Sequence, residues 1–427
     1  MSMNGAIGSI MAARHDPAAR IRNIDLVAVM IAAILPWSTS GVAILSVLWM
    51  VALLWALDLR AFAQSLKRPI SALPIALFML AVVGMLWSDA PWGTRLYSVG
   101  PTLKLLVLPL LLYHFERTPR GRWVFVAFLA SSALLMAVSW LVVLDPDIAI
   151  RGGDAQRGVF VKNYIDQGQS FALCAVALAF PIYSLLRERR ILPALMLLVL
   201  VLGLLANMAL VIVSRTAMVT MPIMLAVFAV LHLRWRTSLM IFVGIVLLAG
   251  ASFAASSQLQ WTMKTFLRDY ELYKERNIPT SIGLRLEYWQ KSLRFIGEAP
   301  LAGHGTGSTR GLFESARVGT PVDASGQAVA NPHNQTFAVA IQWGVIGVVV
   351  LYAMWLVHLL LFRGEGFAAW VGLLVVVQNI LSSLFNSHLF DFHEGWMYVL
   401  GVGTAGGMVI RATSRGEVED PSEMARR

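Results

Sequence analysis

Long apolar runs separated by short polar segments occupy nearly the whole chain. A helix needs about 20 mostly apolar residues to cross a bilayer, so each such run is a candidate transmembrane helix. The pattern therefore predicts an all-α polytopic membrane protein with about twelve transmembrane helices. The twelve runs lie at about 24–36, 41–57, 71–87, 98–115, 123–143, 168–186, 192–213, 216–232, 238–256, 334–361, 367–386 and 394–411.

The spacing of these runs divides the chain. Only Ser214 and Arg215 separate the seventh run from the eighth, which predicts a tight hairpin or a broken helix. After the ninth run comes a long polar segment. We therefore expect an N-terminal transmembrane bundle of about nine spans, a loop domain, about three C-terminal transmembrane helices and a short tail. Their bounds are 1–256, 257–333, 334–411 and 412–427.

The apolar positions within the loop domain have a helical period. Ile282, Leu286, Trp289, Leu293 and Ile296 follow each other at intervals of four, three, four and three residues. This spacing is the stripe of an amphipathic helix. We expect this helix to lie against the mouth of the membrane bundle.

Composition and charge set the orientation. The 427 residues are 58% hydrophobic and 14% charged, with a net charge of +10. In a soluble protein that charge would suggest nucleic acid, but here most basic residues outside the loop domain stand in alternate short loops. Because cytoplasmic loops carry an excess of Lys and Arg, both termini are predicted to be cytoplasmic and the loop domain periplasmic. Topology explains the charge, so no nucleic-acid partner is expected.

The N-terminal segment and the single cysteine add little to the prediction. Met1 to Asn23 lacks an apolar core followed by a small-residue cleavage site, so we interpret it as a retained cytoplasmic tail. The single cysteine, Cys174, lies in an apolar run and allows no disulfide framework.

Motifs for nucleotides and zinc are absent from the sequence, which argues against nucleotide-driven pumping and structural zinc. Asp145–Asp147 has the Asp-x-Asp form of metal-dependent sugar transferases, but its place at a span end favours a turn or cap. His388 and His393 flank Asp391, and for them we favour interfacial packing over a metal pair. We therefore expect no metal.

Two arginines are candidates for binding an anion. Arg215 falls between two apolar runs, where an ionisable group is costly and marks a functional site by default. Arg285 lies one turn before Trp289, on the flank of the amphipathic stripe. A guanidinium suits phosphate because its planar fork donates two hydrogen bonds while staying charged. Interfacial anchoring of Arg215 and snorkelling of Arg285 remain alternatives.

His333 is the candidate catalytic residue. It follows Pro332, which favours an extended residue before it, and it stands where the tenth run begins as a helix. The positive end of a helix dipole favours neutral imidazole, which can accept a proton from a sugar hydroxyl. The Gly-rich stretch from Pro300 to Gly307 is interpreted as a structural turn, with a phosphate cradle as the alternative.

These residues resemble motifs of the bacterial O-antigen ligases, within the wider group that includes O-antigen polymerases and O-linked protein oligosaccharyltransferases. The most specific match is His333-Asn334, nine residues, and then Gly344-Val-Ile-Gly347. The resemblance covers most of the chain. The other matching positions are Ser214 and Arg215, Arg157 and Gly158 through Asn163, and Arg285 with Trp289, Pro300, Gly303, Gly305 and Gly307.

The resemblance implies a C-type glycosyltransferase fold in the bacterial inner membrane. Such an enzyme would move O-antigen glycan from undecaprenyl diphosphate to a hydroxyl of the lipid A–core oligosaccharide, on the periplasmic face, with inversion and without a metal or other cofactor. His333 would be catalytic, and Arg215 and Arg285 would bind the diphosphate. Arg157 and Asn334 would add donor or acceptor contacts. Membrane lipids are the remaining expected partners, and we expect a monomer.

Two alternatives stay open. An O-antigen polymerase or a protein oligosaccharyltransferase would use the same donor and differ in its acceptor, although the His333 pattern favours the ligase. A transporter or flippase for the lipid-linked glycan would need charges along a path through the bundle. Lys104 is the clearest charge within a predicted span, so the scarcity of such charges favours an enzyme at one face.

Overall fold

A computed structural model describes residues 17–150, 154–212, 214–320 and 322–416. These residues form helices joined by turns and loops, with no strand among them. The helices are α2 (Pro17–Ile34), α3 (Thr39–Leu54), α4 (Leu59–Leu66), α5 (Pro69–Val83), α6 (Trp92–Val99), α7 (Val107–Phe115), α8 (Arg122–Leu144), α9 (Tyr164–Ala177), α10 (Ala179–Arg187), α11 (Ile191–Asn207), α12 (Arg215–His232), α13 (Trp235–Ala255), α14 (Ser257–Arg276), α15 (Ser281–Glu298), α16 (Ser308–Ser315), α17 (Gln335–Leu361), α18 (Phe367–Ser382) and α19 (Phe392–Ser414).

Short helical turns connect several of these elements. Four are 3₁₀ turns, and η5 is a π-helical turn that continues α11. They are η1 (Gly100–Leu106), η2 (Pro119–Gly121), η3 (Pro146–Ile148), η4 (Ala155–Arg157) and η5 (Met208–Ile212).

The predicted class, a polytopic helical membrane protein, is confirmed, whereas twelve spans are not. Among the described residues, 6 helices are long and apolar enough to cross a bilayer, or up to 7 if the bent pair of α3 and α4 is one span. The runs predicted at 24–36 and 394–411 form α2 and α19, of 18 and 23 residues, which are not among these six. The remaining predicted runs form shorter helices. Three of these are apolar helices of 10–17 residues, and α5 is one of them.

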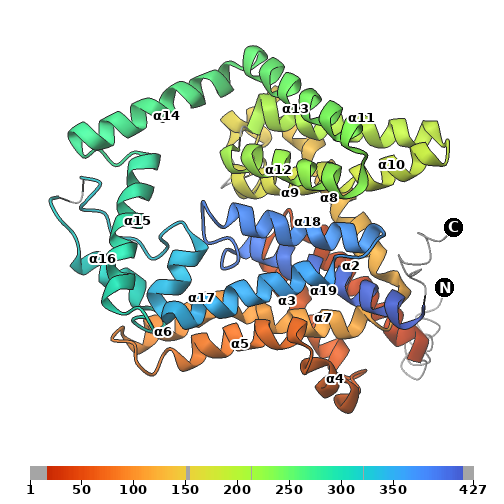
Figure 1. The fold of residues 1–427 in the computed structure, drawn as a ribbon, viewed down its shortest axis with the longest axis horizontal. Helices are drawn as coiled ribbons and strands as arrows, with labels where there is room; N and C mark the ends of the chain where they lie inside the picture. Colours follow the sequence, from red (N-terminus) through yellow and green to blue (C-terminus); the bar gives the residue numbers. More distant parts are fainter. Residues whose placement is uncertain (1–16, 151–153, 213, 321, 417–427) are drawn as a thin grey trace.

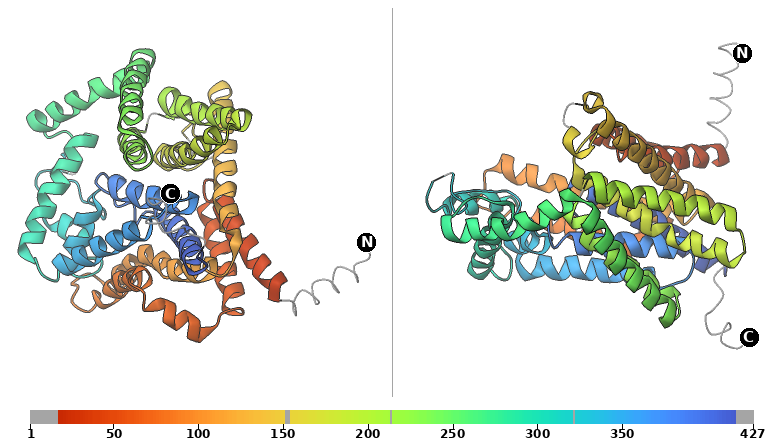
Figure 2. Two further views of the ribbon diagram at one scale, coloured as in Figure 1. Left: turned by 45° about the vertical axis from the view of Figure 1, so that its right-hand side comes forward. Right: turned by 90° about the horizontal axis from the view of Figure 1, so that it is seen from above.

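The helices form two groups that pack against each other through α2 and α8 and through α12 and α18, and an arch of helices also links them (Figure 1). The first and last parts of the chain lie together: α19 packs against α7 and α18, and α17 packs against α5. Helices α8 to α12 form the second group, and α13 and α14 arch from it to α15 and α16 (Figure 2). The chain enters α2 and leaves α19 at one end of the molecule, while α15 and α16 lie at the other (Figure 1). That second end carries the predicted site residues of the loop domain.

Close approach between helices depends on small residues. Gly407 of α19 faces α7, where a Cβ atom would lie 2.8 Å from the carbonyl oxygen of Leu112. Gly403 meets Leu111 of the same helix in the same way. Small residues let helix backbones pack closely where lipid supplies no hydrophobic drive for association. This contact fixes α19, and therefore the loop before it, relative to the N-terminal helices.

The turn between α2 and α3 lies beside the middle of α8. The indole Nε1 of Trp37 donates a hydrogen bond to Ser131 Oγ, 2.7 Å away, and Ser131 lies near the centre of α8. The loop after α8 then folds back over this turn, because Lys162 Nζ donates to the carbonyl oxygen of Leu35 at 2.5 Å. The α2–α3 turn therefore forms part of the floor beneath the candidate site.

A kink in α17 explains the glycine of the His-x₁₀-Gly motif. Gly344 has φ 58° and ψ −153°, and a Cβ atom there would lie 2.2 Å from the carbonyl oxygen of Leu301. The Gly-rich turn enters this kink: the backbone N–H groups of His304 and Gly305 donate to the carbonyls of Ile341 and Gln342, at 2.9 and 2.8 Å. The structural interpretation of that turn is therefore confirmed. The motif's spacing is the length of α17 between its start and its kink.

Candidate active site

His333 stands just outside the start of α17. Its backbone has φ 54°, a left-handed conformation that is costly for a residue with a Cβ atom. The backbone N–H of His333 donates to Asn331 Oδ1 at 2.9 Å, and Asn334 caps the helix by accepting from the N–H of Phe337 at 3.1 Å. Two asparagine side chains thus hold the strained turn that presents the imidazole.

The imidazole of His333 is oriented through one nitrogen. Its Nδ1 lies 2.8 Å from Asn386 Oδ1, and Asn386 Nδ2 donates to Asp391 Oδ2 at 2.6 Å. Because the carboxylate of Asp391 accepts hydrogen bonds, the amide NH₂ of Asn386 must face Asp391. The amide oxygen of Asn386 must then face the imidazole of His333. Nδ1 is then the protonated nitrogen, and Nε2 carries the lone pair. Asn331 Nδ2 donates to the same Asn386 oxygen at 3.0 Å.

The surroundings keep this imidazole neutral. Burial lowers the pKa of His333 below 6.5, and the nearby charge of Arg285 lowers it further, against the opposing hydrogen bond to Asn386. The predicted direction is therefore correct, but the leading causes are burial and a cation, with no contribution from the helix dipole required. The ring of Tyr288 stacks on the imidazole at 6.1 Å between centroids and 23° between planes.

Arg285 projects from α15 toward this group of imidazoles. Its charge acts on both His333 and His388, which places the guanidinium beside both rings. The predicted helix exists, but its buried face is turned by about one residue from the predicted stripe. Tyr288 and Phe295 are buried there, while Leu293 is 60% exposed. The cause is packing of the two aromatic rings against Phe313, at 5.7 and 5.2 Å between centroids.

The predicted break at Ser214 and Arg215 is present. The helix before the break, α11, continues into η5. The helix after it, α12, begins at Arg215, with Ser214 in extended conformation as its N-cap. Ser214 packs closely on α9, because a Cβ atom at Gly168 would lie 2.6 Å from Ser214 Cβ. The backbone of Arg215 is therefore placed beside α9. The predicted phosphate contact of its side chain lies outside the described residues.

A buried cluster of charged and polar groups lies beneath His333, and sequence reasoning found it only in part. A cavity of about 320 Å³ is lined by side chains from the start of α9 and from the loop before α19, among them Asn163, Asp166, Asn386, His388 and Asp391. Burial, with the charge of Arg285, lowers the pKa of His388 to about 3. Burial raises the pKa of Asp391 to about 6, against the opposing charge of Lys104.

Two lysine side chains reach into this cluster. Lys104 Nζ donates to the carbonyl oxygens of Phe390, at 3.0 Å, and Asp391. Lys162 Nζ lies 3.2 Å from His393 Nδ1, and Ser170 Oγ lies 2.8 Å from the other nitrogen of that ring. Lys104, the clearest intramembrane charge in the sequence, therefore has carbonyl partners. These positions come from three separate stretches of chain, so no local pattern could have revealed the whole cluster.

Residues 200–352 match the family model described as O-antigen ligase. The matched part contains the start of α12, Arg285, His333 and Gly344, which are the positions where the geometry above is most constrained. This match supports membership of the O-antigen ligase family. The chain is accordingly a membrane glycosyltransferase of the ligase and polymerase type. No curated protein sequence matches the chain.

Two of the residues that the ligase resemblance suggested have structural contacts of their own. Arg157 pairs with Asp154, with 3.4 Å between Nε and Oδ2, and its guanidinium lies 4.4 Å over the ring of Tyr164. Asn334 uses both ends of its amide, since it also donates to the carbonyl oxygen of Leu384 at 3.2 Å. These contacts hold the loop before α9 and the start of α17. A substrate contact by either residue stays a prediction.

Metal binding by this ligase-family chain can be judged from its donor groups. The Asp145–Asp147 turn is a cap, as expected, because Asp145 Oδ1 accepts from the N–H of Asp147 at 3.2 Å. His388, Asp391 and Glu394 each have a ligand atom within 4.8 Å of the others. Lys104 interacts electrostatically with both of these carboxylates, so its ammonium form would compete with a metal ion for them.

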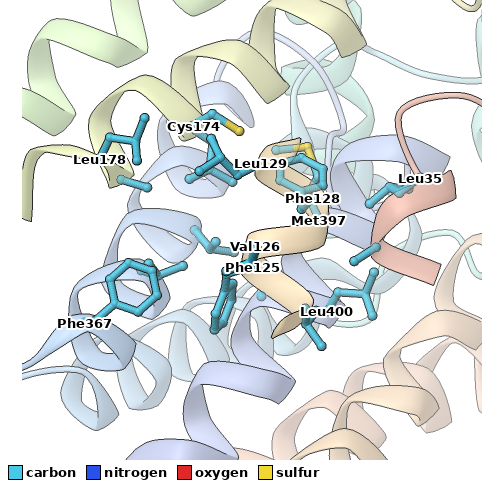
Figure 3. A pocket seen from close by; sticks show the side chains of 17 residues that line it. Leu35, Phe125, Val126, Phe128, Leu129, Cys174, Leu178, Phe367, Met397 and Leu400 are labelled. Carbon is cyan, nitrogen blue, oxygen red and sulfur yellow. The ribbon is translucent and has the colours of Figure 1, made fainter. Parts of the chain in front are cut away.

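The apolar cavity drawn in Figure 3 is separate from this site. It measures about 100 Å³, and its lining includes Phe125, Phe128, Cys174, Phe367 and Met397. None of the predicted site residues lines it. The cysteine is buried there, which agrees with its prediction as an isolated thiol in an apolar run.

Proposed function

We propose that this chain transfers O-antigen glycan from undecaprenyl diphosphate to the lipid A–core oligosaccharide, on the periplasmic face of the bacterial inner membrane. The observation that carries the proposal is the state of His333. Its Nδ1 is tied to Asn386, its Nε2 carries a lone pair, and a cation lies beside it. A neutral imidazole next to a guanidinium suits a reaction that removes a proton from a hydroxyl and develops charge on a phosphate.

In the proposed reaction, the acceptor hydroxyl oxygen attacks C1 of the first glycan sugar. The bond between C1 and the diphosphate oxygen breaks, with inversion at C1, and undecaprenyl diphosphate leaves. The hydroxyl proton passes to His333 Nε2. Arg285 stabilises the negative charge that develops on the leaving group, and Arg215 is proposed to join it. With two arginines in this role and Lys104 in the acidic cluster, the proposed transfer uses no metal.

The experiment is a reconstituted transfer assay. Purified protein is mixed with undecaprenyl diphosphate-linked glycan and lipid A–core, with and without EDTA. Product that forms in EDTA and disappears in His333→Ala supports the proposal. The matched control is His304→Gln, because His304 Nε2 lies 2.8 Å from the carbonyl oxygen of Phe295 and a glutamine amide can replace that hydrogen bond. This control should retain nearly full activity.

Other outcomes would redirect the proposal. Product that extends the lipid-linked glycan itself would identify a polymerase, and glycan attached to an added protein would identify an oligosaccharyltransferase. Transfer that requires Mg²⁺ or Mn²⁺ and is lost in Asp391→Asn would contradict the metal-free mechanism. Normal transfer by His333→Ala would overturn the role of His333.

A further inference from the structure

A second cavity lies on the other side of Asp391. It measures about 420 Å³, and we call it the α6 groove. Its lining comes from α6 and η1, from the start of α16, from the first turns of α17 and from the loop before α19. Its lining includes Thr94, Tyr97, Ser98, Asn331, Arg310 and Gln342.

The His333 network separates the two cavities. Asn386, which accepts from His333 Nδ1, lines the cavity beneath the ring, whereas Asn331, which accepts from the His333 backbone N–H, lines the α6 groove. Asp391 lines both. The two spaces therefore meet at the one group of residues that could carry out the transfer.

The two cavities face different parts of the chain. The cavity beneath His333 includes Asp166, two residues before the glycine that packs on Ser214, so it lies toward the start of α12. That is the arginine side, which the proposed function assigns to the donor's diphosphate. The α6 groove opens toward α6 and α16 instead, and both lie at the far end of the molecule from the termini (Figure 1). If the donor's diphosphate binds beside the arginines, the α6 groove is the cavity that remains for the acceptor.

The side chains of the α6 groove suit a saccharide. The ring of Tyr97 is 84% exposed, and hydroxyl and amide groups of Thr94, Ser98 and Gln342 line the same space. Sugars present apolar C–H faces and hydroxyl edges, which an aromatic face and short polar side chains complement. At the rim, Arg310 is paired at 2.9 Å with Glu314 in an exposed i,i+4 pair. Such a pair is worth little, so the guanidinium can exchange it for a phosphate.

Exposed apolar side chains of α6 and η1 lie close in sequence to residues that line the groove. Leu96 and Leu103 are 62% and 53% exposed, and Trp92, with the guanidinium of Arg95 stacked at 4.5 Å, is 59% exposed. Exposed leucines beside an amphipathic aromatic ring are typical of the membrane–water interface. A molecule in the groove could therefore keep an acyl anchor in the bilayer while its sugars reach Asn331 and Asp391.

We infer that the α6 groove binds the acceptor, the saccharide part of a membrane-anchored glycolipid, and that Tyr97 and Arg310 determine its affinity. Tyr97 stacks on a sugar ring, and Arg310 binds an anionic substituent such as a phosphate. This inference rests on the proposed function, since the acceptor is the lipid A–core glycolipid named there.

The test separates acceptor affinity from donor affinity. Tyr97→Ala, Arg310→Ala and the double variant are assayed in phospholipid nanodiscs, with initial rates measured against lipid A–core and against the lipid-linked glycan. The double variant should raise the acceptor KM about tenfold or more, with donor KM and kcat within about twofold of wild type. Arg294→Ala is the matched control, because Arg294 forms the same i,i+4 pair with Glu298 at 2.9 Å on α15.

A dephosphorylated acceptor tests whether Arg310 binds a phosphate group of the acceptor. Arg310→Ala should weaken binding of the phosphorylated acceptor and leave the affinity for the dephosphorylated one unchanged. An equal loss with both acceptors would overturn the role of Arg310. A rise in donor KM with acceptor KM unchanged would assign the groove to the donor instead and overturn the inference.

A binding measurement keeps this result distinct from the proposed function. The Kd of lipid A–core is measured without donor, in His333→Ala protein with and without the two groove substitutions. Equal affinity in both proteins overturns the inference, whatever the turnover. Weaker binding in the groove variant, together with a wild-type protein that does not transfer glycan to lipid A–core, would support the groove and contradict the proposed reaction.

Discussion

The two ends of α17 each hold a histidine in a different state. Near the cytoplasmic end predicted from the sequence, His358 is fully buried and both its nitrogens are engaged, with Nδ1 2.6 Å from Tyr398 Oη and Nε2 3.0 Å from the carbonyl oxygen of Ile70. At the other end, His333 is half-buried, and only Nδ1 has a partner that orients it. A histidine with both nitrogens satisfied contributes to stability, whereas one that keeps a nitrogen available can act on a substrate.

Exchanging each histidine for alanine gives the largest expected difference. His333→Ala should lower the rate of glycan transfer by about 10²- to 10⁴-fold, the range for loss of a general base, with thermal unfolding nearly unchanged. His358→Ala should instead lower the free energy of unfolding by about 1–3 kcal/mol, because Tyr398 and Ile70 lose their partner inside the bundle. Transfer rates and unfolding in detergent measure both. A catalytic loss in both variants would remove the distinction.

The second prediction concerns the cation beside His333. Arg285→Ala should lower kcat by about 10²- to 10³-fold, since a group that stabilises developing charge is lost. Arg285→Lys should recover only part of this, because lysine lacks the planar fork. Arg294→Ala, on the exposed face of the same helix, is the control and should behave as wild type. Full activity of Arg285→Lys would show that charge alone is sufficient.

The third prediction addresses the residue that orients the ring. Asn386→Ala removes the hydrogen bond that orients His333, worth about 1 kcal/mol, together with those to Asn331 and Asp391, and should slow transfer about fivefold or more. Because that hydrogen bond raises the pKa of His333, its loss should also move the acid limb of the pH–rate profile to lower pH. A slower enzyme with an unchanged profile would assign Asn386 to structure alone.

The variant with the smallest expected effect on glycan transfer changes Gly344, at the kink of α17. Gly344→Ala forces a Cβ atom into a left-handed position against Leu301, which should cost about 1–3 kcal/mol of stability. Gly297→Ala is the control, because a Cβ atom there meets open space within α15. It should be neutral or slightly stabilising. Thermal unfolding compares the two, and equal stability would contradict the account of the motif.

Some features of the fold and of the candidate site could be predicted from the sequence, and others could not. The apolar run that became α17 was evident from hydropathy, as was the break at Ser214, since both are local patterns. The number of spans was harder to predict, because α5 and α18 are short and α3 and α4 form a bent pair. His333 and Arg285 could be named because each stands at an unusual place in its own helix. Asn386 could not, because it follows His333 by 53 residues in an ordinary loop.

The pH–rate profile of glycan transfer tests the state of His333 most directly. Its pKa is lowered, so the imidazole stays neutral below pH 6.5, and transfer should be lost only as the pH falls through that lowered value. Arg285→Gln removes a nearby positive charge, so the pKa should rise and the acid limb should move to higher pH. The limb should persist in Asp391→Asn, which eliminates the carboxyl group whose pKa is about 6. A limb at or above pH 6.5 in the wild type, or no movement in Arg285→Gln, would contradict a neutral His333 as the proton acceptor.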